Sequence, residues 1–272
     1  MSFIIHPTCK IHPSVKINVV NGYIGPNAII NNDVVIEGYL VEIGREAFID
    51  KYSTIGGGSC FDSEAFLKTG DWFHMGVNSQ VNIARGVSIG HEVGIGIDSK
   101  IFTHGAYLDC LNIGAPAQWG SVSIGNNVWI PNAWINPSVE IGSNVVIGAR
   151  SLVNSNIPSG SLAVGSPVKI IKSNYYPREL NSIEKDNLWS LIETQLLNRL
   201  KDNNYSSEII IDKDKYLIIL NIEKKITIFD LKLKKITGYY STQANLIKDQ
   251  LRRNGIRFRY EEVNSKWHPW DL

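Results

Sequence analysis

The segment Ile124-Gly125-Asn126-Asn127-Val128-Trp129 sets a pattern that returns in Ile135-Asn136-Pro137-Ser138-Val139-Glu140, Ile141-Gly142-Ser143-Asn144-Val145-Val146 and Ile147-Gly148-Ala149-Arg150-Ser151-Leu152. A period of six residues is neither the 3.6-residue period of a helix nor the two-residue alternation of a strand. It is typical of a parallel β-helix, in which each unit supplies a short strand and a turn. No unit buries its own apolar face, so stability comes from stacking the leading Ile or Val of successive units.

The same phase occurs earlier in the chain, at residues 24–28, 43–47, 83–87, 89–93 and 95–99. We therefore expect a coiled domain over residues 1–172, with loop insertions near 56–76 and 105–121 where the repeat is interrupted. Loops on a rigid solenoid are where binding groups gather. Trp72 and Trp119 lie in these stretches. They are expected either to belong to a binding site or only to cap exposed edges of the coil.

These repeats resemble the hexapeptide-repeat acyltransferases, most specifically over residues 122–130 and over the closing segment 156–171. The resemblance implies a left-handed parallel β-helix. The hand is taken from the family, because the general rule for parallel crossovers would give a right-handed coil. It also implies a homotrimer that draws its acyl group from acetyl-CoA and needs no metal.

Composition sets broad limits on function. Hydrophobic residues make up 43% of the chain, charged residues 19%, and the formal net charge is +1. This balance disfavours nucleic-acid binding, and no apolar run is long enough to span a membrane, so we expect a cytoplasmic protein. The three cysteines, Cys9, Cys60 and Cys110, match no metal or redox spacing and are expected as reduced thiols.

The repeat ends at Lys172, and residues 173–272 are expected to form a small α+β domain. Asn181 and Glu184 form a capping-box start for an amphipathic helix over 182–200. Strands are predicted at 208–211, 216–222, 226–231 and 256–260, with a second helix at 242–254. Basic residues such as Lys234, Arg253 and Arg257 indicate either a docking surface for an anionic acceptor or an ordinary solvated surface.

Histidine is the residue expected to carry the chemistry, because acyl transfer needs a base that titrates near neutral pH. His104 stands where the repeat gives way to the second insertion, and it looks like the general base of sugar and antibiotic acetyltransferases in the family. The residues that follow it, Gly105-Ala106, depart from the usual pattern. His91, followed by Glu92, resembles the His-acid pair of amino-sugar N-acetyltransferases and is the competing candidate.

The resemblance also implies which residues hold the substrates. The donor is expected along the last coils, with Trp129 near the acyl group, Ala149 and Ser151 on the pantetheine arm, and Arg150, Lys169 and Lys172 at the phosphates. The segment 130–134 is one residue short of the repeat, so Trp134 is expected to reshape this groove. The expected acceptor-binding residues are Asp71, Trp72, His74, Asn78, Asn82, Glu92 and Asp109.

Three functions stay open at this level. The first is an O-acetyltransferase acting on a sugar hydroxyl in bacterial surface-polysaccharide biosynthesis, and the second is an N-acyltransferase acting on a nucleotide-linked amino sugar. The third is a non-catalytic trimeric scaffold. A zinc carbonic anhydrase on the same fold is disfavoured, because His74, His91 and His104 contain no pair five residues apart.

Overall fold

The computed structural model describes residues 2–205 and 208–269. The chain divides into two compact units, Met1–Arg178 and Glu179–Leu272. Among the described residues, no helix is both long and apolar enough to cross a membrane.

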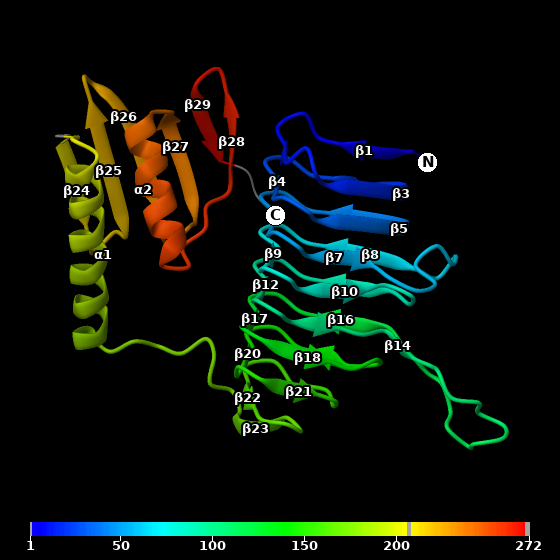
Figure 1. Ribbon diagram of the computed structural model, residues 1–272. Coiled ribbons are helices and arrows are strands. Elements are labelled where there is room, and N and C mark those ends of the chain that lie inside the picture. The colour runs from blue at the N-terminus through cyan, green and yellow to red at the C-terminus, as the bar shows by residue number, and fades with distance from the viewer. Residues whose placement is uncertain (1, 206–207, 270–272) are drawn as a thin grey trace. The chain divides into compact units, whose positions relative to one another are not determined.

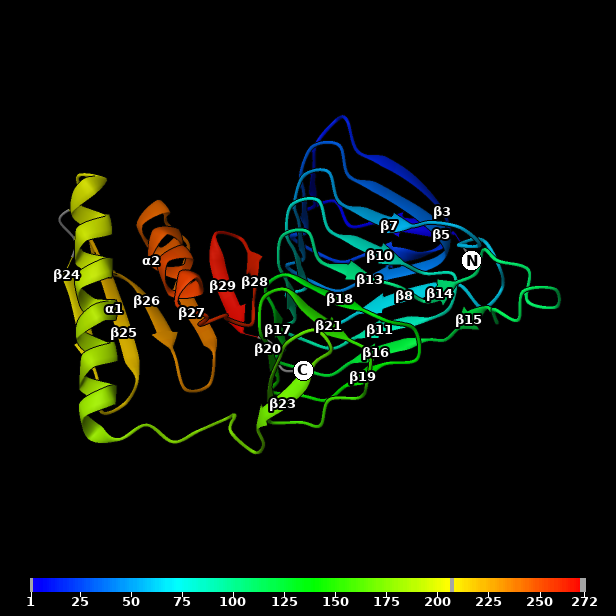
Figure 2. The same cartoon turned by 60° about the horizontal axis from the view of Figure 1, so that its bottom comes forward.

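The first unit is a parallel β-helix whose coils stack one below another (Figures 1 and 2). A sheet of twelve strands makes two of its three faces, and these faces meet along the long strands β3 (Lys16–Ile24) and β5 (Val35–Ile43). β1 (Phe3–Ile5) pairs with the last residues of β3. Nearly all pairing between coils is parallel, as the six-residue period predicts.

The shorter strands fall into three sets, which we call the first, second and third faces. The first face holds β8 (Phe66–Thr69), β11 (Val87–Ile89), β16 (Val122–Ile124) and β19 (Glu140–Ile141). The second holds β2 (Lys10–Ile11), β4 (Ile29–Ile30), β6 (Phe48–Ile49), β9 (His74–Met75), β12 (Gly94–Ile95), β17 (Trp129–Ile130), β20 (Val146–Ile147), β22 (Leu162–Val164) and β23 (Lys169–Lys172). The third holds β7 (Thr54–Gly56), β10 (Gln80–Asn82), β13 (Lys100–Ile101), β18 (Ala133–Ile135) and β21 (Ser151–Val153).

Each face buries one column of mostly branched side chains, which together form the core. All of them are at most 4% exposed: Ile24, Ile43, Ile89, Ile124, Ile141 and Ile157 on the first face, Ile30, Ile49, Met75, Ile95, Ile130 and Ile147 on the second, and Ile36, Ile55, Val81, Ile101, Ile135 and Val153 on the third. Burying one such side chain stabilises the fold by about 1.5–3 kcal/mol. The columns are therefore the main reason that the coils stack.

The chain turns at three corners between the faces. The first corner joins the first face to the second, the second corner joins the second to the third, and the third corner joins the third back to the first. Glycines pack closely at the first corner: a Cβ added to Gly125 would lie 2.8 Å from the carbonyl carbon of Gly142 in the next coil. A side chain there would push the coils apart.

The two interruptions of the repeat both emerge at the third corner, and the prediction for the first is wrong in extent. β8 and β9 lie inside the predicted insertion 56–76, so the irregular chain is confined to residues 57–65. The reason is that Leu67 and Met75 continue the core although no Ile-Gly pair marks them. In the second interruption, β14 (His104–Gly105) pairs antiparallel with β15 (Gln118–Trp119) at the root of a projecting loop (Figure 1).

The second unit is an α+β domain. Its antiparallel sheet has the order β24-β25-β26-β27-β29-β28. Its elements are α1 (Ser182–Asp202), β24 (Glu208–Asp212), β25 (Leu217–Ile222), β26 (Lys225–Asp230), β27 (Lys235–Tyr239), α2 (Thr242–Arg253), β28 (Tyr260–Val263) and β29 (Lys266–Pro269). The fold class predicted from the sequence, mainly β with a parallel β-helix followed by an α+β unit, is confirmed.

Both predicted helices are confirmed, and the Asn181–Glu184 capping box forms as expected. The strand predicted at 256–260 is wrong for most of its length. Residues 256–258 form no strand, because Phe258 turns into the core of the unit, and the strand begins only at Tyr260. The sequence pattern also missed β27 and β29, which complete the sheet.

Candidate active site

The third corner brings His104 together with residues from two other coils. His104 Nδ1 lies 3.0 Å from Asn82 Oδ1, at the end of β10. The same Asn82 oxygen accepts from the Thr103 hydroxyl at 2.6 Å and from the Ala84 amide at 3.2 Å. An oxygen that already accepts from an N–H and an O–H can bond Nδ1 only if Nδ1 carries its hydrogen. Neutral His104 therefore keeps its lone pair on Nε2.

A glycine lies beside that nitrogen. Gly58, in the first interruption, faces the ring, and a Cβ added to it would lie 3.8 Å from His104 Nε2. Asn82 itself is only 4% exposed, so it holds the buried side of the ring while Nε2 faces the loops. Asn82 was predicted as an acceptor-binding residue, and the structure places it behind the histidine instead.

An aromatic and a cationic side chain complete the surroundings of His104. The Trp119 ring stacks on the imidazole, with centroids 5.0 Å apart and planes 17° apart. The Arg85 guanidinium carbon lies 4.5 Å from the centroid of the Trp119 ring. Arg85 also contacts Glu64 at 3.1 Å and Asp62 at 3.8 Å, both in the first interruption. Sequence analysis missed Arg85, because it occupies the third place of a hexad as Arg45 does.

His91 occupies a different environment, at the first corner. There, from Asp71 to Ser159, the residue at the third place of each successive first-corner turn uses its side chain to accept the backbone N–H of the equivalent residue one coil earlier. We call this set the first-corner ladder. Its bonds run from Arg45 N to Asp71 Oδ1, Asp71 N to His91 Nδ1, His91 N to Asn126 Oδ1, Asn126 N to Ser143 Oγ and Ser143 N to Ser159 Oγ, at 2.7–3.0 Å.

The ladder sets the tautomer of His91. Its Nδ1 accepts the Asp71 amide at 3.0 Å, so in the neutral ring the hydrogen is on Nε2. The Asp71 carboxylate lies 3.5 Å from the same nitrogen, where it meets no N–H of the neutral ring. The geometry at His91 is therefore that of a turn-stabilising side chain.

The other predicted acceptor residues are scattered over the coil. Asp71, Trp72 and Glu92 lie at the first corner, where Trp72 and Glu92 adopt left-handed turn conformations with φ of 56° and 58°. His74 stacks on Phe48 on the second face. At the second corner, Asn78 donates to Asp98 at 2.6 Å.

Asp109 lies in the second interruption, but its carboxylate is engaged by its own loop. It accepts from the amides of Leu111 and Asn112 and from the Asn112 side chain at 2.6–2.9 Å. The amide of Asn112, then its side chain and the Leu111 amide, lower the pKa of Asp109. The carboxylate thus shapes the loop rather than pointing to His104.

The predicted donor residues separate into two groups. Trp134 lies on β18 beside the strand that leads to His104, and its ring meets Phe102 edge-on at 5.9 Å. At the neighbouring second corner, Arg150 adopts φ of 59° after Ala149. The Ser151 hydroxyl donates to the Gly148 carbonyl and accepts the Gly165 amide, whereas the predicted contact with the pantetheine arm concerns the backbone groups of Ala149 and Ser151.

Trp129, Lys169 and Lys172 belong to the second face. The Trp129 ring lies over Gly94, where an added Cβ would come within 2.7 Å of the indole. Lys172 Nζ lies 3.9 Å from the centroid of the Tyr175 ring. Because the second face is the one that does not adjoin the third corner, these residues are not gathered around His104 of the same chain.

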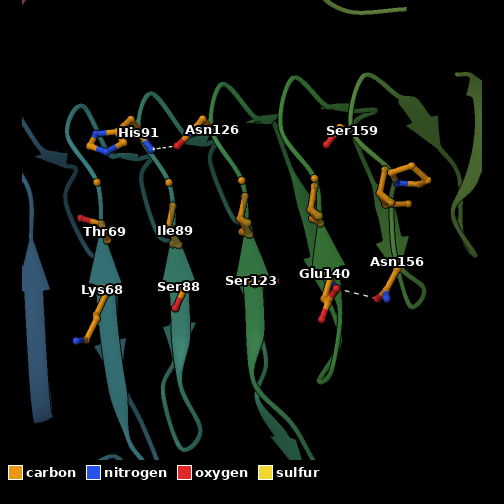
Figure 3. Close-up of a pocket in the computed structure, with 18 of the residues that line it drawn as sticks. Lys68, Thr69, Ser88, Ile89, His91, Ser123, Asn126, Glu140, Asn156 and Ser159 are labelled. Atoms are coloured by element: carbon orange, nitrogen blue, oxygen red, sulfur yellow. Dashed lines mark hydrogen bonds between the residues drawn. The ribbon is translucent and has the colours of Figure 1, made fainter. Parts of the chain in front are cut away.

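A groove of about 930 Å³ runs along the outside of the first face (Figure 3). Polar side chains line it, including Lys68, Ser88, Ser123, Glu140 and Asn156, and His91 lies at the turn end. Its residues are at the ends of the first-face strands remote from the third corner. The groove and His104 are therefore separate features.

Comparison with known proteins settles the family. Galactoside O-acetyltransferase of Escherichia coli (strain K12) is 30% identical over 151 residues, which cover 52% of this chain and 71% of that protein. The chain belongs to the hexapeptide-repeat acetyltransferase family. The family resemblance drawn from the repeats, and with it the enzyme class of acyltransferase, is confirmed.

Other acetyltransferases match over shorter or more divergent stretches. Chloramphenicol acetyltransferase of Morganella morganii is 38% identical over 72 residues, 26% of this chain and 34% of that protein. Among solved structures, galactoside acetyltransferase in complex with coenzyme A has a TM-score of 0.41 at 26% identity, over 53% of this chain and 72% of that chain. The polySia-specific acetyltransferase NeuO has a TM-score of 0.45 at 20% identity, over 66% and 84%. No family model matches the chain.

Among residues 2–205 and 208–269, no group of three or more His, Cys, Asp or Glu side chains is arranged to hold a metal ion. The third corner holds an oriented imidazole whose neutral ring keeps its lone pair on Nε2, which suits proton abstraction.

Proposed function

We propose that this chain is an acetyl-CoA-dependent O-acetyltransferase that acts on a sugar hydroxyl, with His104 as its general base. The observation that carries the proposal is the bond between His104 Nδ1 and Asn82 Oδ1, which leaves the Nε2 lone pair directed away from the core. Galactoside O-acetyltransferase supports a sugar as the acceptor. Surface-polysaccharide biosynthesis is the setting that we propose for it.

The reaction follows from that tautomer. His104 Nε2 takes the proton of the sugar hydroxyl as its oxygen attacks the thioester carbonyl carbon of the donor. The carbon–sulfur bond then breaks, and the imidazolium returns the proton to the departing thiolate. Asn82 keeps Nδ1 protonated throughout and stabilises the charged ring, because its oxygen continues to accept from Nδ1.

Trp134 and Arg150 are the residues of this chain best placed to hold the donor near its own His104. Phe102 and Trp134 form an apolar surface on the third face, leading from the second corner toward His104. That surface suits a pantetheine arm, and Arg150 at its far end suits a phosphate. Acetyl-CoA is the substrate that supplies the activated acyl group.

We also propose that the enzyme works as a homotrimer. Trp129, Lys169 and Lys172 lie on the face that does not adjoin the third corner of their own chain. If they bind the donor, as the family resemblance implies, they serve His104 of a neighbouring copy. A fully active monomer, identified by light scattering, would contradict this arrangement.

The competing base is His91 with Glu92, the pair that resembles amino-sugar N-acetyltransferases, and the first-corner ladder accounts for His91 without catalysis. The deciding experiment is calorimetric titration with acetyl-CoA and coenzyme A, followed by release of free thiol with galactosides and nucleotide-linked amino sugars as acceptors. We expect donor binding and turnover that His104→Ala lowers by roughly 10²- to 10⁴-fold. His91→Ala is the matched control and should keep turnover. If neither acetyl-CoA nor coenzyme A bound, the proposal would be wrong and the trimeric scaffold would be favoured.

A further inference from the structure

We propose that Trp119 and Arg85 form a positioning stack that holds the His104 ring in its catalytic orientation, and that this stack is assembled from both interruptions of the repeat. The catalytic consequence rests on the proposed function, whereas the effect on the ring does not. Neither residue touches the reacting atoms in this assignment, so both act through His104.

The first contact is between Trp119 and His104, which are held together by the backbone as well as by their rings. The two residues are paired in the two-stranded β14–β15 ladder, which is the root of the second interruption. Their rings are nearly parallel at 5.0 Å. Asn82 holds the imidazole at one atom only, Nδ1. With that hydrogen bond alone, the ring can still rotate about the axis of the bond. A stacked indole removes that freedom by covering one face of the ring.

The second contact is made by the Arg85 guanidinium on the indole. Arg85 lies over Trp119 at 4.5 Å, a distance at which a cation is attracted to an aromatic face by about 0.5–2 kcal/mol. Arg85 is itself fixed, because Nη1 donates to the Ala84 carbonyl at 2.7 Å and its backbone amide donates to Thr103 Oγ1 at 3.1 Å. Trp119 therefore contacts both the imidazole and a fixed guanidinium.

The third set of contacts ties in the first interruption. Glu64 and Asp62 pair with Arg85 from residues 57–65, while Trp119 belongs to the second interruption. These exposed ion pairs each contribute only about 0.2–1 kcal/mol, so they orient Arg85 more than they stabilise the fold. Contacts thus run from Glu64 through Arg85 and Trp119 to His104 and Asn82. Residues from both interruptions of the repeat therefore help to hold the His104 imidazole.

The test compares Trp119→Ala and Trp119→Phe in the full-length protein. Tyr107→Ala is the matched control, because Tyr107 is an aromatic residue of the same loop that is 98% exposed. The first readout is the ¹⁵N spectrum of the His104 ring in protein labelled at its six histidines, assigned with His104→Gln. The second is kcat and KM for acetyl-CoA. Circular dichroism checks that each variant is folded, as expected for substitutions in a surface loop.

We expect the wild type, Trp119→Phe and Tyr107→Ala to show one tautomer with hydrogen on Nδ1. Trp119→Ala should show a mixture of tautomers and lose roughly 10- to 100-fold in kcat with unchanged KM, since misorientation of a catalytic group costs about that much. Arg85→Gln should have a smaller effect in the same direction. An unaltered ¹⁵N spectrum in Trp119→Ala would overturn the proposal.

Failure of the proposed function is distinguishable from failure of this inference. If His104→Ala retained turnover, the base assignment would be wrong, but the ¹⁵N spectra would still decide whether Trp119 holds the ring. If the spectra changed in Trp119→Ala while kcat did not, the positioning role in catalysis would be rejected.

Discussion

Asn82 is the residue whose replacement tests the active-site geometry most directly. Its oxygen accepts three hydrogen bonds, from His104, Thr103 and Ala84, within a site that is 4% exposed. Asn82→Leu has a similar shape and removes all three. Asn82→Asp keeps an oxygen at the same place and preserves them, so the two variants form a matched pair.

The expected magnitudes follow from those contacts. Thr103 can still donate to the Asn82 backbone carbonyl, which lies 3.2 Å from its hydroxyl. The Ala84 amide has no such substitute in a fully buried residue, and an unsatisfied buried donor costs about 1–3 kcal/mol. We therefore expect Asn82→Leu to lower the free energy of unfolding by about 2–4 kcal/mol, including the lost bond to His104.

The catalytic effect should exceed what the loss of stability explains. Without Asn82, nothing holds hydrogen on His104 Nδ1, so turnover should fall roughly 10²- to 10⁴-fold, the range assigned to general-base catalysis. Asn82→Asp should stay within about tenfold of the wild type, because a carboxylate orients an imidazole in the same way. Urea unfolding and thiol release from acetyl-CoA, both measured below the unfolding transition, give the two quantities. Turnover of Asn82→Leu equal to that of Asn82→Asp would refute the reasoning.

Three further predictions test the fold and its charges. His91→Ala should lower stability by about 1 kcal/mol, since the Asp71 amide loses its acceptor, and an unchanged urea midpoint would contradict the ladder. Gly125→Ala should lower the melting temperature, because its Cβ would lie 2.8 Å from Gly142 C, whereas Gly105→Ala, with open space around it, should not. Burial raises the pKa of Asp249, but the Arg252 hydrogen bond and the charges of Arg252, Arg253 and Arg199 outweigh it and lower the pKa. Because the pKa of Asp249 is lower in the native state than in the unfolded state, where it is near 4, the ionised carboxylate stabilises the fold at pH values above about 4. This stabilisation is lost as the pH falls through the native pKa. Asp249→Asn should therefore destabilise at pH 7 by about 1 kcal/mol, screened by solvent, and should destabilise less at pH 2. Equal destabilisation at both pH values would exclude this linkage.

The core of the coil was predictable because the signal for it is local. The first place of a hexad predicts a buried Ile from six residues of sequence alone, and Ile124, Ile141 and Ile147 all lie in the core. Which residues become neighbours in adjacent coils could not be predicted in the same way. Successive residues of the first-corner ladder are separated by 26, 20, 35, 17 and 16 residues, so no constant spacing relates one coil to the next.

This variation explains what the sequence could not reveal about the site. His104 and Asn82 are 22 residues apart, and His104 and Trp119 are joined only through the antiparallel root of a loop. Asn82 was singled out as a loop amide, yet its role behind the histidine depends on how much chain each interruption contains. Arg85 resembled an ordinary turn residue because its partners, Glu64 and Trp119, come from the two interruptions.

The contrast between the two histidines shows why the site lies where the repeat breaks. In the first-corner ladder, the side chain at the third place of the hexad accepts an amide of the preceding coil, and His91 does so with its Nδ1 lone pair. The resulting tautomer has hydrogen on Nε2 and no base directed outward. At the third corner, Asn82 presents an acceptor to Nδ1 and reverses the tautomer. The same side chain is therefore structural at a regular turn and suited to catalysis at an interruption. A functional base in this coil requires a position at which the repeat no longer uses the side chain to satisfy its own backbone.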